Sequence, residues 1–289
     1  MKPFCLGIIG YPLAHSYSPR LHQAALQDCG LRGKYELHPL PLSPGWQQAL
    51  AELFQRMRQG EMDGLNVTIP HKQAVMPFLD ELTPSAQAIG AVNTISHLPS
   101  GLLGDNTDAP GFLAHLAGLL SGVWERPAAH APHALLLGAG GSARAVAYGL
   151  AQAGWRVSLA ARRLDQARQV ARLCAQDEAG AIPLEQNALD GFLQHNEPDL
   201  LVNTTPLGMW PQVQDCPWPA GLPLPQALVY DLVYNPAQTV LLQRARAAGC
   251  KASNGLGMLV EQAALSFERW TGRSPSRLVM RQAITEQAA

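Results

Sequence analysis

Five short runs of polar residues have the types and spacing to bind a small ligand. They are Ser16-Tyr17-Ser18, Asn66 to Lys72, Ala91 to Thr94, Gly104 to Asp108 and Asn254 to Gln262. Together they supply hydroxyls, amides, an ammonium group and a carboxylate. Each run follows or ends a predicted strand, or opens a predicted helix, which is where ligands bind in α/β sheets. This set of groups suits a small, polyhydroxylated, anionic ligand.

Some of these residues also have a purely structural interpretation. Ser18 precedes Pro19 and could be a helix N-cap. Asp108 could cap a helix that begins at Ala109. Lys72 at the start of a helix, taken alone, could be a solvated lysine. His71 lies beside Lys72, but its motif assigns it no chemistry.

A glycine-rich turn in the second half of the chain, Gly138 to Ala143, has a different chemistry. It follows an apolar strand-like run, Ala134–Leu137, and opens a helical stretch that extends to Gly154. The first glycine permits the tight turn, the second lets the backbone approach a pyrophosphate, and a small third residue lets the helix pack on the strand. The free N–H groups of the helix N-terminus face the phosphates. The turn therefore predicts dinucleotide binding, with a merely structural turn as the alternative.

The next predicted strand indicates which dinucleotide is bound. NAD sites usually have an acidic residue at the end of this strand, which binds the ribose hydroxyls. Here the strand ends in Ala161-Arg162-Arg163, without an acid. Guanidinium groups suit a 2′-phosphate through charge and paired donors. We therefore predict NADP, with a solvated arginine pair as the alternative.

The elements that must position these motifs alternate along the chain. Strands are expected at Phe4–Ile9, Tyr35–Leu40, Gly64–Ile69, Ala91–Ile95, Leu102–Gly104, Ala134–Leu137, Arg156–Ala160, Asp199–Asn203 and Leu228–Leu232. Helices are expected at Arg20–Cys29 and Trp46–Arg58, after the glycine turn, and from about Asp165. This alternation predicts parallel strands joined by helical crossovers. The second half has the layout of a Rossmann unit, and the Gly-, Pro- and Ala-rich stretch Gly118–Pro132 reads as a connection between domains.

The composition excludes several classes of protein. A length of 289 residues with 47% hydrophobic residues predicts one or two globular domains. A net charge of -1 without a basic block gives no indication of a nucleic-acid surface. No apolar run approaches the roughly 18 residues of a membrane span, and the N-terminus does not resemble a signal peptide. The five cysteines and nine histidines have no metal-ligand spacing, so no metal is expected, and scattered thiols fit a cytoplasmic location.

The motifs, in their order along the chain, resemble those of the shikimate dehydrogenase family, from Gly10-Tyr11-Pro12 to Gln262 and beyond. The resemblance implies an α/β fold with a substrate-binding domain of residues 1–107, rejoined by residues 255–289. It implies an inserted Rossmann domain of residues 108–254, a doubly wound parallel sheet that binds NADP, with the active site in the cleft between the domains. The implied activity is the reversible, NADP-dependent reduction of 3-dehydroshikimate to shikimate in aromatic amino acid biosynthesis, by a monomer or homodimer.

The resemblance also implies roles for individual residues. Lys72 is the catalytic acid–base, paired with Asp108, and Ser16 and Ser18 hold the substrate carboxylate. The residues that bind ring hydroxyls or flank them are Thr68, Asn93, Asp108, Tyr234 and Gln262. The cofactor pyrophosphate lies on Gly138, Ala139, Gly140, Gly141 and Ser142, and the 2′-phosphate on Arg162 and Arg163. The nicotinamide end is lined by Leu232, Gly255 and Met258.

The chain departs from the family pattern at two places, which leaves alternatives open. Tyr17 stands where lysine is common, so quinate or an aminated relative of shikimate is an alternative substrate. Ala161-Arg162-Arg163 stands where Asn-Arg-Thr is common, and Gln166 replaces a further arginine, which bears on cofactor affinity. A non-catalytic NADP-binding sensor is a further alternative, but a sensor need not keep both Lys72 and Asp108. A methyltransferase that uses the Rossmann half alone would leave the first-half motifs unexplained.

Overall fold

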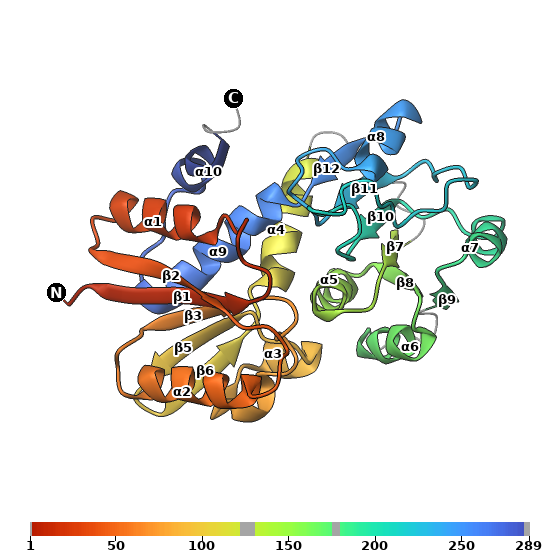
Figure 1. Ribbon diagram of the computed structural model, residues 1–289. Helices are drawn as coiled ribbons and strands as arrows, with labels where there is room; N and C mark the ends of the chain where they lie inside the picture. Colours follow the sequence, from red (N-terminus) through yellow and green to blue (C-terminus); the bar gives the residue numbers. More distant parts are fainter. Residues whose placement is uncertain (1, 122–130, 175–179, 286–289) are drawn as a thin grey trace. The chain divides into compact units, whose positions relative to one another are not determined.

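The computed structural model describes residues 2–121, 131–174 and 180–285. The chain forms two compact units (Figure 1), the first made of Met1–Gly111 with Leu259–Ala289 and the second of Phe112–Met258. Each unit contains one six-stranded sheet with helices packed on it. The boundaries expected from the sequence, after residues 107 and 254, lie slightly earlier in the chain.

The first unit has the strand order β2-β1-β3-β5-β6-β4. Its strands are β1 (Phe4–Gly10), β2 (Gly33–Pro39), β3 (Gly64–Val67), β4 (Glu81–Leu82), β5 (Thr94–Leu98) and β6 (Gly101–Asp105). Its helices are α1 (Ser18–Asp28), α2 (Trp46–Arg58), the short 3-10 helix η1 (Met76–Phe78), α3 (Pro84–Ile89) and α10 (Arg277–Thr285). The helices α4 (Asp108–Leu120) and α9 (Leu256–Thr271) each have residues in both units.

Hydrophobic spacing explains why α2 forms and which face it buries. Leu50, Leu53, Phe54 and Met57 recur every three or four residues and are buried. They pack with Ile9 and other residues of the sheet in one core cluster. The apolar stripe of an amphipathic helix thus covers one face of the sheet, as its period of 3.6 residues requires.

Strand β5 corrects the expectation that all strands are parallel. It begins at Thr94, later than expected, and pairs antiparallel with both β3 and β6. Only Pro99 and Ser100 separate β5 from β6, and two residues suffice for a hairpin, whereas a parallel connection needs a dozen or more. Because β5 runs backwards, its first residue lies beside Asn66 at the carboxyl end of β3. Asn93 therefore precedes a strand and still lies at the edge where β3 ends.

The second unit has the strand order β12-β11-β10-β7-β8-β9, with every pairing parallel. Its strands are β7 (His133–Leu137), β8 (Arg156–Ala161), β9 (Ala181–Pro183), β10 (Leu200–Asn203), β11 (Leu228–Asp231) and β12 (Ala252–Asn254). Its other helices are α5 (Gly141–Gln152), α6 (Leu164–Leu173), α7 (Gln186–Leu193) and α8 (Val240–Ala247). Numbered from β7, this is the 3-2-1-4-5-6 order of a Rossmann fold, so the predicted doubly wound sheet is confirmed.

Strand β7 is buried on both faces, which its apolar sequence predicts. Ala134 and Leu136 pack in one core cluster with residues of α5 and α6. Leu135 and Leu137 pack in another, with residues of α7 and α8. A strand that lacks polar alternation is typical of a parallel sheet covered by helices on both sides.

The connection predicted at Gly118–Pro132 begins within α4, which continues to Leu120. Residues 122–130 of this stretch lie outside the described part of the chain. Within the described residues, no helix is long and apolar enough to cross a membrane.

A buried histidine, His22, is expected to make the first unit sensitive to acid. His22 of α1 is fully buried, stacks on Tyr35 of β2 with ring centroids 4.3 Å apart, and lies 5.3 Å from the ring of Trp270. Burial lowers the pKa of His22 from 6.5 to about 3, because the charged imidazolium loses its hydration. The unfolded chain therefore takes up a proton at a higher pH than the folded chain does.

We expect His22→Phe to reduce this acid sensitivity. The free energy of unfolding should fall as pH drops from 6.5 toward 3, by up to about 4–5 kcal/mol at about 1.4 kcal/mol per pKa unit. The variant keeps an aromatic ring on Tyr35 but has no group to protonate. Urea midpoints at pH 7 and pH 4 measure the effect, with exposed His195→Gln as the control. An equal loss of stability in the wild type and in His22→Phe would contradict this assignment.

Candidate active site

Lys72 and Asp108 form an ion pair in the first unit. Lys72 Nζ lies 2.6 Å from Asp108 Oδ2, and the two side chains are 14% and 6% exposed. Lys72 lies in a turn after β3 rather than on the expected helix start, and it is held there because its carbonyl accepts from Val92 N at 2.8 Å. Because so little of its side chain is exposed, the alternative interpretation of Lys72 as a solvated surface lysine is wrong.

Asn93 is the second partner of Asp108. Its Nδ2 donates to Asp108 Oδ1 at 2.9 Å, so the ion pair and this hydrogen bond engage both carboxylate oxygens. Asn93 Nδ2 also lies 3.3 Å from Gln262 Oε1, and Gln262 Nε2 donates to the carbonyl of Leu259 at 2.9 Å. Because a carbonyl only accepts, this last bond turns the Gln262 oxygen toward Asn93. The structure thus brings four predicted site residues, Lys72, Asn93, Asp108 and Gln262, into one hydrogen-bonded group.

The carboxylate of Asp108 is available to Lys72 because another residue caps the helix. Asn106 Oδ1 accepts from Asp108 N at 3.1 Å and from Ala109 N at 3.2 Å at the start of α4. Asn106 Nδ2 donates to the carbonyl of Ala91 at 2.9 Å, which fixes the amide orientation. The alternative interpretation of Asp108 as a helix cap is therefore wrong.

Ser16 and Ser18 follow β1, and Thr68 follows β3, the strand that pairs with β1 in parallel. The Thr68 N–H donates to Ile9 O, and its side chain packs so closely on Gly10 that a Cβ there would lie 2.2 Å from Thr68 Cγ2. Ser18 is the first residue of α1, so it is not the N-cap residue that its sequence also allowed. Instead, Ser16 Oγ accepts from Ser18 N at 3.3 Å. The two hydroxyls therefore flank the start of a helix, which favours anions.

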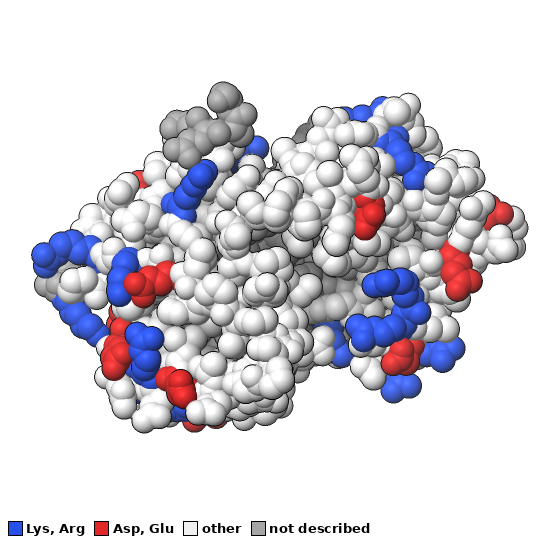
Figure 2. All heavy atoms as spheres, in the orientation of Figure 1, with Lys and Arg blue, Asp and Glu red and all other residues white. Residues whose placement is uncertain are grey.

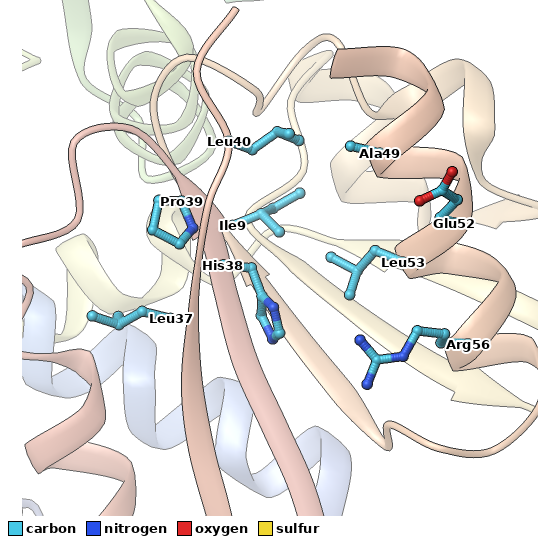
Figure 3. Close-up of a pocket in the computed structure, with 9 residues that line it drawn as sticks. All are labelled: Ile9, Leu37, His38, Pro39, Leu40, Ala49, Glu52, Leu53 and Arg56. Carbon is cyan, nitrogen blue, oxygen red and sulfur yellow. The ribbon is translucent and has the colours of Figure 1, made fainter. Parts of the chain in front are cut away.

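A pocket of about 370 Å³ lies elsewhere in the first unit, against β1, β2 and α2 (Figure 3). Its lining is mostly apolar and includes His38, Glu52 and Arg56, but it contains no residue of the five polar motifs. The arrangement of reactive groups, rather than this pocket, therefore identifies the candidate site.

The glycine turn of the second unit has the geometry that a dinucleotide needs. Gly138 has φ +109°, and a Cβ there would lie 2.7 Å from Thr204 Oγ1, so only glycine fits. Around Gly140 a Cβ would meet nothing within 4 Å, so the backbone at this position is open to a close ligand. Ala143 is fully buried, and the N-cap residue of α5 is Gly140, which has no side chain. These residues fit a pyrophosphate at the helix N-terminus.

Arg162 and Arg163 follow directly after β8, and both are exposed. Figure 2 shows Lys and Arg side chains gathered over α6 and the end of β8. Exposed guanidinium groups directly after the strand are compatible with a 2′-phosphate, and the nearest acid in the sequence is Asp165, in the first turn of α6.

The sequence interpretation did not include Asn203, Thr205 or Asp231, which shape the neighbouring loops. Asn203 Oδ1 accepts from the N–H and hydroxyl of Thr205, and its Nδ2 donates to Asp231 Oδ1 at 2.8 Å. Asp231 also accepts from Thr239 Oγ1 and Val233 N, while its burial raises the pKa of the carboxyl to about 6. The available signal was the polar run Asn-Thr-Thr-Pro immediately after an apolar strand.

The remaining predicted residues lie in the second unit as well. A Cβ on Gly255 would lie 2.0 Å from the carbonyl oxygen of Leu232, so glycine is required for this close approach. Met258 is 6% exposed and packs in the same core cluster as Tyr230. Tyr234 follows β11 and is half-buried. Tyr234 is the one predicted substrate-binding residue that belongs to the second unit.

A Rossmann unit with a fitting dinucleotide turn, joined to an α/β unit that holds a buried lysine–carboxylate pair, defines a two-domain dehydrogenase. Residues 8–95 match the family model of the shikimate dehydrogenase substrate-binding domain. Residues 255–285 match that of the shikimate 5′-dehydrogenase C-terminal domain. The chain belongs to the shikimate dehydrogenase family, as its whole-length relatives show.

One such relative is the NADP⁺ shikimate dehydrogenase of Desulforamulus reducens, with 43% identity over 98% of this chain and 95% of the relative. The structure of shikimate 5-dehydrogenase from Thermus thermophilus, in complex with NADP(H) and shikimate, superimposes with a TM-score of 0.81. It is 39% identical, over 97% of this chain and 98% of that one. Quinate dehydrogenase from Corynebacterium glutamicum, in complex with NAD, gives a TM-score of 0.83 at 31% identity, over 98% and 99% of the two chains.

We expect Gly138→Ala and Gly140→Ala to separate a structural glycine from a ligand-binding one. The first variant forces alanine into a positive-φ conformation against Thr204, which should cost about 1–3 kcal/mol of stability. The second has room for its Cβ and should cost less than about 1 kcal/mol. Its methyl group would instead obstruct a pyrophosphate, so it should lower dinucleotide affinity. Urea unfolding and fluorescence titration measure the two effects, and a strongly destabilised Gly140→Ala would contradict this division.

Proposed function

We propose that this protein catalyses the reversible, NADP-dependent reduction of 3-dehydroshikimate to shikimate, on the route to chorismate and the aromatic amino acids. The observation that carries the proposal is the largely buried Lys72–Asp108 pair, in which Asp108 accepts a hydrogen bond from Asn93, while Asn93 Nδ2 also reaches Gln262 Oε1. Curated relatives with this activity share the chain over nearly its whole length. A non-catalytic sensor need not keep both members of this pair.

Lys72 supplies and removes the proton in this proposal. NADPH, when bound, supplies a hydride to the ring carbonyl, and the oxygen that becomes an alkoxide needs a proton. The Lys72 ammonium stabilises the developing negative charge and donates that proton, and in the reverse direction the amine accepts it. Asp108 keeps the ammonium group in place through its 2.6 Å contact.

Amides and hydroxyls of the first unit would hold the substrate. Asn93, Gln262 and Thr68 present groups that pair with ring hydroxyls, and Tyr234 of the second unit is proposed to join them. Ser16 and Ser18 would hold the carboxylate near the start of α1, where the helix dipole favours a negative charge.

The second unit would hold NADP. Its pyrophosphate would lie on Gly138, Ala139, Gly140, Gly141 and Ser142. Its 2′-phosphate would lie against Arg162 and Arg163, and its nicotinamide end against Leu232, Gly255 and Met258. We also propose a cytoplasmic location, because the five cysteines are all free thiols and fit a reducing compartment.

We expect Lys72→Ala to lower kcat by at least about 100-fold with little change in the KM for shikimate, as for the loss of a general acid–base. Because Asp108 acts through Lys72, the double variant Lys72→Ala/Asp108→Ala should be hardly worse than the poorer single variant. Initial rates of NADP reduction, followed by absorbance, measure both.

The exposed pair Lys34 and Glu36, with a 2.9 Å contact between Nζ and Oε1, is the matched control. Lys34→Ala should leave kcat unchanged. A Lys72→Ala variant that retains most of the wild-type kcat would contradict the assignment of Lys72 as the acid–base. If the losses of kcat in the two single variants multiply in the double variant, Lys72 and Asp108 act independently.

We expect NADP to be preferred over NAD in kcat/KM, and the preference to shrink as salt is added. Charge-assisted hydrogen bonds contribute about 1.5–3 kcal/mol each, and the exposure of both arginines favours the lower end, about 10-fold in affinity. Arg162→Ala should weaken NADP and leave NAD nearly unchanged, whereas exposed Arg168→Ala, further along α6, should change neither. Equal or better turnover with NAD by the wild type would mean that the arginine pair is only solvated.

Quinate is the second candidate substrate. It is favoured by the bulk of Tyr17 between the two serines and by the similarity to a quinate dehydrogenase. A panel of shikimate, quinate and aminoshikimate, each assayed with NADP and with NAD, decides between the two candidates.

A further inference from the structure

Three hydroxyl groups are packed together behind the candidate active site. Thr94 Oγ1 lies 2.7 Å from Ser266 Oγ and 3.2 Å from Thr107 Oγ1, and Thr107 Oγ1 lies 3.1 Å from Ser266 Oγ. All three residues are at most 2% exposed. They come from β5, the loop before α4 and helix α9, so this hydroxyl cluster joins three segments of the chain. Buried hydroxyls at this depth require partners, and here each is a partner of the others.

The cluster continues on both sides through amide side chains. Asn66 Nδ2 donates to Ser266 Oγ at 3.0 Å and to the carbonyl of Asn93 at 3.1 Å, while Asn66 Oδ1 accepts from Tyr35 OH at 2.8 Å. On the other side, Thr94 Oγ1 and Thr107 Oγ1 lie 3.0 and 3.2 Å from Asn93 Oδ1. A buried hydrogen-bonded chain therefore runs from β2 to the Lys72–Asp108 pair.

Thr107 fixes which way the Asn93 amide points. Its backbone N–H donates to Asn93 Oδ1 at 2.7 Å, and an N–H can only donate, so the oxygen of the amide must face it. The amide nitrogen then faces Asp108 Oδ1 and Thr107 Oγ1, at 2.9 and 3.0 Å. One hydrogen of Asn93 Nδ2 is thus donated to Asp108, and the other faces the Thr107 hydroxyl at 3.0 Å and, at the longer distance of 3.3 Å, Gln262 Oε1.

We propose that Thr107 is a positioning residue for the reaction, through its side-chain hydroxyl. This inference rests on the proposed function, in which Asn93 and Asp108 hold the substrate and Lys72. Without the hydroxyl, one N–H of Asn93 keeps only the longer contact of 3.3 Å with Gln262 Oε1, and a poorly paired donor in a buried site is unfavourable. The Asn93 amide would still accept from the Thr107 N–H, but its nitrogen would be held less firmly, which weakens the hydrogen bond to Asp108 Oδ1 that orients this carboxylate toward Lys72.

The test compares Thr107→Val, which keeps the shape and removes the hydroxyl, with Thr107→Ser, which keeps the hydroxyl. We expect Thr107→Val to lower kcat/KM for shikimate about 10-fold or more, with kcat itself reduced, and Thr107→Ser to remain within about 3-fold of the wild type. Thr271→Val is the control, because Thr271 is a half-buried threonine of the first unit whose hydroxyl donates to the carbonyl of Phe267 at 2.8 Å, outside the hydroxyl cluster. It should leave kcat/KM unchanged. Wild-type kcat/KM in Thr107→Val would overturn the inference.

A second measurement separates positioning from a general packing role. If Thr107 acts through Asn93, then Thr107→Val should have no further effect on kcat in an Asn93→Ala background, whereas independent contributions would multiply. Multiplied losses would overturn the inference while leaving the proposed function intact. If the wild type does not turn over shikimate with NADP, the proposed function fails by itself, and the same comparison is made with whichever substrate of the panel is turned over. With that substrate as well, a Thr107→Val variant that has the wild-type kcat/KM overturns the role of Thr107.

Discussion

The ion pair between Lys72 and Asp108 imposes the strictest requirement on the first unit. Two charges that leave water lose hydration free energy. Their mutual attraction offsets this loss only where the geometry is good and the remaining lone pairs accept hydrogen bonds. Here the second carboxylate oxygen accepts from Asn93, and Asn93 is itself held by Thr107 and Gln262. The pair therefore depends on a complete set of buried hydrogen bonds. Such a set is consistent with a fixed orientation of the lysine ammonium, which proton transfer to a substrate requires.

The antiparallel strand β5 makes this set of hydrogen bonds possible. A parallel β5 would have its first residues at the edge of the sheet away from the end of β3. Reversed, it has Thr94 beside Asn66 and Asn93 at the edge where Lys72 follows β3. Helix α9 then supplies Ser266 and Gln262 from the end of the chain, close enough to α4 that a Cβ on Gly111 would lie 2.8 Å from Gln262 N. Close packing and hydrogen bonding thus both hold α9 against α4.

The second unit satisfies a different constraint, that of bringing backbone close to a ligand. Gly138 allows the Thr204 side chain to pack against the turn, and Gly140 leaves the start of α5 open. Asp231 holds the loops that follow β10 and β11 through Asn203 and Val233. Its burial is tolerated because three donors face the carboxylate. The unit therefore combines loops fixed by a buried carboxylate with a turn at which Gly140 leaves open space.

The sequence by itself determined the elements with strong local signals. The apolar strand β7, the glycine turn with its helix, the arginine pair and the spacing on α2 predicted the Rossmann unit and its dinucleotide chemistry, because these features depend on residues close in the chain. The polar motifs identified Lys72 and Asp108 through a family resemblance. Only the tertiary structure decided that β5 is antiparallel and that Asn106, not Asp108, caps α4. It alone showed that Thr107, Thr94 and Ser266 share hydrogen bonds. Those features depend on pairings between distant segments, and local propensity carries no information about which distant groups will meet.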